Sequence, residues 1–276
     1  MAAGLAFAAF RHALLLVGAA IMLAPFAWML LSSLKPPDEI FATTLHLLPD
    51  RWYAAENYVR AFEKVPLGRY LLNGFAVAAA IFLLQALVAV PCAYALAKLR
   101  FGGRDTLFGL VMLGLLIPPQ VPAIPVYVLL YKAGLLNTYG ALVLPSAISV
   151  FGIYLMRQFF RTVPDELIQA ARLDGCSEWT IVWRIMLPTA VPALVAFGIL
   201  SFVWNWNDYF WPLLVITDPE LLTPPLGTVY LSNQEAGTDF GPLMAGTAVI
   251  TAPLVIAFLV AQRRFVQGMT MAGLKF

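Results

Sequence analysis

Charged residues are scarce in this sequence. Asp, Glu, Lys and Arg make up 12% of the 276 residues, and hydrophobic residues make up 61%, whereas soluble domains have about 25% charged residues. The net charge of +2 is too small to indicate a nucleic-acid partner. With only Cys92 and Cys176, no disulfide framework is expected. These deficits exclude an ordinary soluble domain and indicate an integral membrane protein.

Side chains suited to metal or phosphate chemistry are also few. The only histidines are His12 and His46, and the sequence has no H-E-x-x-H pattern, no Cys/His cluster and no phosphate-binding Gly-Lys loop. A zinc site and a nucleotide-hydrolysing loop are therefore not expected. We predict no catalytic residue, no metal and no cofactor. A membrane-embedded hydrolase or transferase is correspondingly disfavoured.

Long stretches without charge are what the sequence does contain. Six windows lack Asp, Glu, Lys and Arg: residues 12–34, 70–97, 106–131, 133–156, 185–207 and 240–262. Each exceeds the ~20 residues that a bilayer-crossing helix needs. Helices satisfy their backbone groups within one segment, and the runs are too long for barrel strands. The prediction is an all-α membrane protein with six transmembrane helices, the first being a retained span rather than a cleaved signal peptide.

The distribution of Lys and Arg predicts the orientation. With the N-terminus inside, six of the 17 basic residues lie outside: Lys35, Arg51, Arg60, Lys64, Arg69 and Lys132. The other eleven face the cytoplasm, which agrees with the usual excess of positive charge on that side. Both termini are then cytoplasmic. The expected organisation is a first helix with an outer loop (residues 1–68), a membrane domain (residues 69–262) and a cytoplasmic tail (residues 263–276).

Four prolines interrupt the third window. Pro118, Pro119, Pro122 and Pro125 each remove a backbone donor and favour kinks or unwinding. Two interpretations stay open: a broken helix next to a pore, or a kink absorbed by packing.

A charged elbow, "TVPDELIQAARLDGCSEWTIVWRIMLP", separates the fourth and fifth windows. Acidic residues after Pro164 suit a helix start, Gly175 can adopt the left-handed conformation that ends the helix, and Ser177 can cap a second helix. The pattern predicts helix, glycine hinge, helix. The elbow is either a docking segment for another protein or an amphipathic helix at the membrane interface.

Four residues of "FVWNWNDYFWPLL" lie near one helical face, namely Trp204, Asn207, Asp208 and Trp211. A carboxylate at the end of a span should face a cavity or a partner rather than lipid, so the first three of these residues are candidates for a translocation pathway. The alternative is an outer aromatic belt in which Asp208 is already hydrated.

Residues 169–188 resemble, position for position, the E-A-A-x3-G-x9-I-x-L-P motif of ABC importer permeases. Ala170, Ala171, Gly175, Ile185, Leu187 and Pro188 are in register, whereas the Glu of the motif is Gln169 here. "SSLKPPDEIF", "AYALAKLRFGGRD" and "QRRFVQGMTMAGLKF" also resemble permeases for maltose-type and glycerol-3-phosphate-type substrates, although "AGLKF" matches the family's C-terminus only loosely.

The resemblance implies a type I ABC importer permease fold in the bacterial cytoplasmic membrane. In that family the elbow is a coupling helix, seated in a cleft of an ATPase, which here assigns Gln169, Ala170, Ala171, Asp174 and Gly175. The implied partners are a homologous second permease, two ATP-binding cassette subunits that hydrolyse the ATP, an extracytoplasmic solute-binding protein and membrane lipid. The solute, a sugar, polyol or glycerol phosphate, follows from the resemblance only.

The same resemblance implies that a second outer loop, "TDPELLTPPLGTVYLSNQEAGTDFGPL", contacts the binding protein. Its tip is expected at "SNQEAG", with the candidates Ser232, Asn233, Gln234 and Glu235, because this stretch is polar and contains glycine. A solvated connector is the alternative. For the whole chain, the competing function is a stand-alone secondary transporter, which usually shows inverted repeats and paired broken helices. No internal repeat is evident, which favours the importer.

Overall fold

The computed structural model describes residues 2–42, 46–232 and 239–273, and within these ranges the regular structure is helical, with no strand. The chain divides into two compact units. Unit 1 comprises Met1–Gly68 and Gly227–Pro253, and unit 2 comprises Arg69–Leu226 and Leu254–Phe276.

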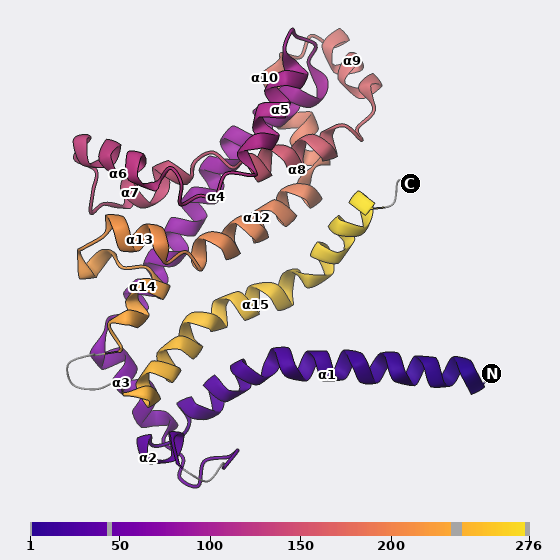
Figure 1. The fold of residues 1–276 in the computed structure, drawn as a ribbon. Coiled ribbons are helices and arrows are strands. Elements are labelled where there is room, and N and C mark those ends of the chain that lie inside the picture. Colours follow the sequence, from indigo (N-terminus) through magenta and orange to yellow (C-terminus); the bar gives the residue numbers. More distant parts are fainter. Residues whose placement is uncertain (1, 43–45, 233–238, 274–276) are drawn as a thin grey trace. The chain divides into compact units, whose positions relative to one another are not determined.

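Among the described residues, three helices are long and apolar enough to cross a membrane on their own. They belong to α1 (Ala2–Ser33), α4 (Leu67–Lys98) and α15 (Phe240–Gly273), shown in Figure 1. Their apolar portions are Ala9–Ser33, Leu67–Lys98 and Phe240–Leu259. Uninterrupted apolar composition predicted each of these spans, and the all-α class is confirmed.

The remaining helices are shorter. In unit 1 they are α2 (Pro37–Ile40) and α3 (Ala54–Lys64). Those beginning in unit 2 are α5 (Arg104–Gly114), α6 (Ala123–Lys132), α7 (Tyr139–Val143), α8 (Val150–Phe160), α9 (Asp165–Leu173), α10 (Glu178–Thr180), α11 (Leu187–Thr189), α12 (Val191–Trp206), α13 (Phe210–Val215) and α14 (Pro224–Val229). A π-helical turn, Ile181–Met186, links α10 to α11.

The fourth and fifth windows form bent helix pairs. Tyr139–Ser146 and Val150–Phe160 meet at 44°, and Glu178–Thr189 and Val191–Trp206 meet at 82°. If each pair is one span, the described residues contain five spans against the six expected. The window at residues 106–131 is divided into α5 and α6, because Pro118, Pro119 and Pro122 lie between them and cannot donate helical hydrogen bonds.

Aromatic and aliphatic side chains pack the bundle of unit 2. Here α8 packs against both α5 and α12, and Phe197 of α12 is 1% exposed in a cluster with Ala89, Leu96 and Ile153. The Phe197 ring meets the Phe82 ring edge to face, with 5.7 Å between ring centroids. Gly152 permits this packing, since a Cβ there would lie 2.3 Å from the Phe197 ring.

Gly152→Ala is therefore expected to destabilise the bundle, by about 1–3 kcal/mol for an overpacked core. Thermal unfolding followed by fluorescence-detected gel filtration in detergent measures the loss. Gly109→Ala in α5 is the matched control, since a Cβ there has no atom within 4 Å. If both variants melted at the wild-type temperature, the close packing at Gly152 would be refuted.

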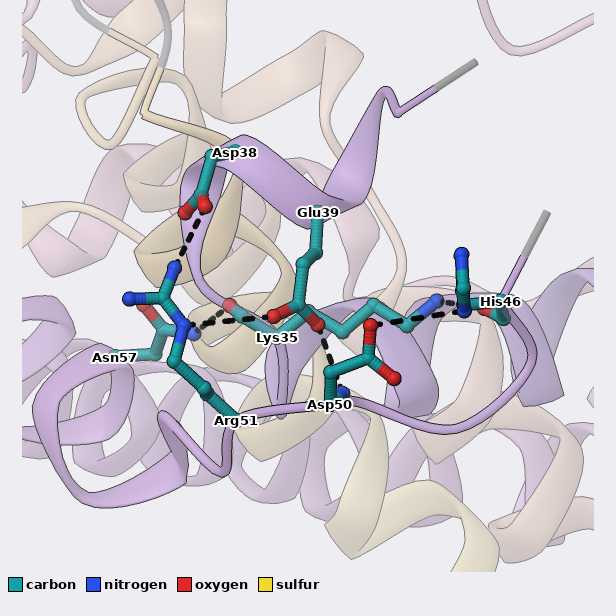
Figure 2. Close-up of polar contacts among 7 residues, drawn as sticks. All are labelled: Lys35, Asp38, Glu39, His46, Asp50, Arg51 and Asn57. Carbon is teal, nitrogen blue, oxygen red and sulfur yellow. Dashed lines mark hydrogen bonds and ion pairs between the residues drawn. The ribbon is translucent and has the colours of Figure 1, made fainter. Parts of the chain in front are cut away.

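A polar network orders the loop that follows α1 in unit 1 (Figure 2). Lys35 is 1% exposed, and its Nζ donates to the His46 carbonyl and lies 5.3 Å from the Trp28 ring centroid. Asn57 donates to the carbonyls of Ser33 and Lys35 at 3.0 and 2.8 Å. Side-chain bonds to backbone thus fix where the chain turns from α1 into α3.

Ion pairs close the same loop. Arg51 lies 2.6 Å from Asp38 and 3.7 Å from Glu39, and the Asp50 amide donates to Glu39 at 3.0 Å. Figure 2 shows these contacts bringing the chain around Asp50 back to α2. The loop is stabilised by polar contacts because it is too short to enclose a core of its own.

Candidate functional site

The elbow has the predicted order of helix, glycine turn and helix. Helix α9 ends in a turn in which the Gly175 amide donates to the Arg172 carbonyl and the Cys176 amide donates to the Ala171 carbonyl, both at 3.0 Å. Gly175 has φ +79°, the left-handed conformation that this terminating motif requires and that glycine adopts without a Cβ clash. Ser177 then caps α10 by accepting from the Thr180 amide.

Charged contacts hold the two arms of the elbow together. Arg172 donates from Nε to Glu178 Oε1 at 2.8 Å and from Nη2 to Glu178 Oε2 at 3.3 Å. The Tyr94 hydroxyl of α4 donates to the same carboxylate at 2.5 Å. Such a two-pronged arginine contact restricts geometry as well as adding energy. The elbow is therefore braced against α4 across the glycine turn.

A second contact fixes the start of α9. Lys98 Nζ donates to the Val163 carbonyl at 2.6 Å and to Asp165 Oδ1 at 2.5 Å. The hydrogen bond and the positive charge of Lys98 hold the pKa of the Asp165 carboxyl below its ordinary value. Asp165 thus stays charged at neutral pH, where it also suits the positive end of the α9 dipole.

The elbow has an inner and an outer face. Ile168 and Ala171 are 3% and 6% exposed and belong to the core cluster that includes Phe160, Ile181 and Met186. The other candidates, Gln169, Ala170, Asp174 and Gly175, are exposed. Leu173 is 89% exposed and Trp179 is 65% exposed, although neither was predicted as a site residue.

A cavity of about 710 Å³ lies in unit 2 between the broken segment after α5 and the end of α12. The expected pathway residues Trp204, Asn207 and Asp208 all line it. Asp208 lies after the end of α12, and its Oδ1 accepts from the Trp211 amide at 3.2 Å. The Trp211 indole donates to the Ala141 carbonyl at 2.9 Å. The cavity therefore combines a hydrogen-bonded indole ring with a carboxylate.

Sequence reasoning missed several polar residues of this cavity. Gln120, Ser146, Asn205 and Tyr209 also line it. Gln120 reaches it because the chain is not helical between α5 and α6, and Pro119 and Pro122 on either side line the same cavity. The proline cluster in the sequence indicated that the helix is interrupted here. Of the two interpretations, the structure supports a broken helix rather than a kink absorbed by packing.

A chain of buried hydrogen bonds connects two residues of the cavity lining, Ser146 and Asn205, to Gln85 of α4. Gln85 of α4 donates to the Ser146 carbonyl at 2.8 Å and accepts from the Ser201 hydroxyl at 2.7 Å. Asn205 donates to the Ser201 carbonyl at 2.7 Å. Since buried polar groups are costly unless they are paired, these hydrogen bonds restrict how α4 and α12 can pack.

Of the expected binding-protein contacts, only Ser232 lies within the described residues. Its hydroxyl donates to the Val229 carbonyl at 3.0 Å, just after α14. Asn233, Gln234 and Glu235 lie outside the described residues. Over the described part of the chain, no group of three or more His, Cys, Asp or Glu side chains is placed to hold a metal ion.

The chain is similar to curated transport proteins over nearly its whole length. It is 34% identical over 262 residues to the diacetylchitobiose uptake system permease protein NgcG of Streptomyces coelicolor, covering 94% of this chain and 86% of that protein. It is 32% identical over 267 residues to the sn-glycerol-3-phosphate transport system permease protein UgpE of Escherichia coli, covering 94% and 95%. It is 33% identical over 253 residues to the arabinooligosaccharides transport system permease protein AraQ of Halalkalibacterium halodurans, covering 91% and 90%.

The fold is also found among solved structures. A chain of a bacterial ABC transporter involved in import of the acidic polysaccharide alginate matches with a TM-score of 0.82 and 24% identity, covering 94% of this chain and 96% of that chain. An alginate transporter in complex with an alginate pentasaccharide-bound periplasmic protein matches with a TM-score of 0.60 and 15% identity, over 93% and 95%. These likenesses establish the fold.

A family model described as binding-protein-dependent transport system inner membrane component matches residues 86–271. That range includes both the elbow and the cavity, and it describes a transport family rather than a catalytic one. The chain therefore belongs to the family of inner-membrane permease components of binding-protein-dependent ABC importers.

Proposed function

We propose that this permease carries a carbohydrate, or a similar polyhydroxylated solute, through the cavity lined by Trp204, Asn207 and Asp208. The single observation that carries the proposal is the composition of that cavity. Its indole faces suit the apolar C–H faces of a sugar ring, and its amides and carboxylate suit hydroxyl groups. The names of the relatives, which include oligosaccharide and glycerol phosphate systems, support this solute class.

The proposed source of energy is ATP hydrolysis in partner subunits. On this proposal the outer face of the elbow, with Gln169, Ala170, Asp174 and Gly175, docks on an ATP-binding cassette subunit. Ala171 is buried inside its own bundle, so it acts by seating α9 rather than by touching the partner. The proposed assembly has two such ATPases, a homologous second permease and an extracytoplasmic solute-binding protein, which the loop around Ser232 contacts.

We further propose that the chain crosses the membrane six times, with α5 and α6 together forming one broken span. Both termini and the elbow are then cytoplasmic, and the segment between α13 and α14 is extracytoplasmic. The membrane domain is proposed at residues 69–262, between the first helix with its outer loop and a cytoplasmic tail at residues 263–276.

Thiol labelling tests this topology. In a Cys92→Ser background, Thr217→Cys should react with a membrane-impermeant maleimide added to intact cells, because Thr217 is exposed in the segment after α13. Cys176 in the elbow should react only after the cells are opened. Labelling of Cys176 from outside, or of the Thr217→Cys variant only from inside, would reverse the proposed orientation.

Uptake measurements test the solute class. Cells that express the complete importer should accumulate at least one radiolabelled oligosaccharide, polyol or glycerol phosphate, and deletion of this chain should abolish that accumulation. Amino acids and inorganic ions serve as controls. Accumulation of an amino acid but of no polyhydroxylated solute would overturn the proposal.

A further inference from the structure

A second cavity lies at the elbow end of unit 2, away from the residues assigned to the pathway. It has a volume of about 730 Å³ and is formed by the end of α4, the start of α5, the end of α8 and the start of α9. Four of its lining residues are cationic, namely Lys98, Arg104, Arg157 and Arg161. The transport proposal uses none of them at a solute site.

Arg157 is the unusual member of this group. Its side chain is buried, with 7% of the residue exposed, and its Nε donates to the Leu96 carbonyl at 3.1 Å. Its guanidinium carbon lies 3.5 Å from the centroid of the Phe108 ring. Within the described part of the chain it has no carboxylate within ion-pair distance and no further hydrogen bond. Apart from the Phe108 ring and the Leu96 carbonyl, no described group offsets the cost of burying this cation, so a bound anion would be stabilised here.

The neighbouring charges leave the cavity positive. Lys98 is paired with Asp165 at 2.5 Å, and Arg104 is paired with Asp105 at 3.0 Å. Arg157 and Arg161 have no carboxylate partner among the described residues, and only one lining carboxylate, Glu166, lacks a pairing cation there. The unpaired groups therefore sum to a net positive charge beside a buried arginine.

We propose that this cavity binds a phosphate group, presented by the headgroup of an anionic phospholipid in the leaflet on the elbow side. The guanidinium fork matches phosphate oxygens in charge and geometry. The cavity lies at the ends of helices α4 and α8, which belong to apolar spans or bent span pairs. Basic pockets between membrane helices are known to take lipid phosphates. Free inorganic phosphate offers the same chemistry from a different source.

Native mass spectrometry of the purified importer complex tests the proposal. The complex is prepared in phosphatidylcholine nanodiscs with or without an equal part of phosphatidylglycerol, then released into detergent, and retained lipid is counted. Arg161→Gln removes an exposed charge and should fold normally, and Arg157→Gln removes the buried fork. Lys132→Gln, which removes an exposed charge from the end of α6, is the matched control.

The wild type and Lys132→Gln are expected to retain phosphatidylglycerol, and each cavity variant should retain about tenfold less, as expected for loss of one charge-assisted contact. Retention that added inorganic phosphate does not reduce identifies lipid as the source. Displacement by inorganic phosphate supports the phosphate site but assigns it to the free anion. Equal retention in all four proteins, with no effect of phosphate, overturns the proposal, and since no transport is measured, that result leaves the solute proposal intact.

Discussion

Gly175→Val is expected to separate the permease from its ATPase while leaving the permease in the membrane. Gly175 has φ +79° and ends α9, and a β-branched residue in that conformation is strained by about 1–3 kcal/mol. The strain should open the turn that aligns the exposed face of the elbow. After purification through a tag on this chain, we expect about tenfold less ATPase subunit, and binding-protein-stimulated ATP hydrolysis should fall in parallel.

Gly175→Asn is the matched control for this experiment. Asparagine tolerates the left-handed conformation, and a Cβ at Gly175 meets no atom of this chain within 4 Å. If the asparagine variant keeps its ATPase, the backbone turn alone explains the effect of valine. If it also loses the ATPase, the partner surface lies close to Gly175. Full ATPase retention and stimulation in the valine variant would refute docking and favour the interfacial-helix interpretation.

Asp208→Leu is expected to lower solute uptake by about tenfold or more while the complex still assembles. Asp208 lines the 710 Å³ cavity, and loss of a hydrogen bond to a charged group costs about 1.5–3 kcal/mol. Because the carboxylate also accepts from the Trp211 amide, part of the change could be structural, so the melting temperature of each complex is measured as well.

Asp208→Asn separates these two contributions. Asparagine keeps the shape and the acceptor that the Trp211 amide requires, but it removes the charge. Low uptake in both variants, with a wild-type melting temperature for the asparagine variant, assigns the effect to the charge in the pathway. Wild-type uptake by Asp208→Leu would favour the aromatic-belt interpretation and would remove Asp208 from the pathway.

The amino-acid pattern predicted the long spans and the elbow for local reasons. Charge-free runs specify α1, α4 and α15 because only helices satisfy the backbone over such lengths. The turn at Gly175 was predictable because few other residues adopt a positive φ. Both features depend on neighbouring residues alone, which is why no tertiary information was needed.

Tertiary contacts explain what could not be predicted. Arg172 and Glu178 are six residues apart, outside the three- and four-residue spacings that place helical side chains together, and only the turn at Gly175 brings them into contact. Ala171 belongs to the motif that predicts docking, yet its side chain is buried. The face of α9 that carries Ala171 packs toward Ile181 and Met186. The sequence predicts Arg157 only as a basic residue at a span end. Its burial beside Phe108, and the lack of a carboxylate within ion-pair distance among the described residues, depend on tertiary packing.

The lining of the solute cavity could be predicted only in part from the sequence. Trp204, Asn207 and Asp208 share a short stretch and could be grouped by helical spacing, whereas Gln120 and Ser146 come from segments far away in sequence. Their proximity depends on the break between α5 and α6 and on the 44° bend before α8. A proline pattern predicts that a helix is interrupted, but not which cavity the interrupted segment faces.

ATP-dependent uptake in proteoliposomes tests the central claim most directly. The complete complex is reconstituted with ATP or a non-hydrolysable analogue on the elbow side, with solute-loaded binding protein on the other side and with an ionophore that dissipates ion gradients. We predict uptake with ATP that the ionophore leaves unchanged, no uptake with the analogue, and about tenfold less uptake when the Gly175→Val permease is used. Uptake by this chain alone, driven by an ion gradient and abolished by the ionophore, would contradict the account and establish a secondary transporter.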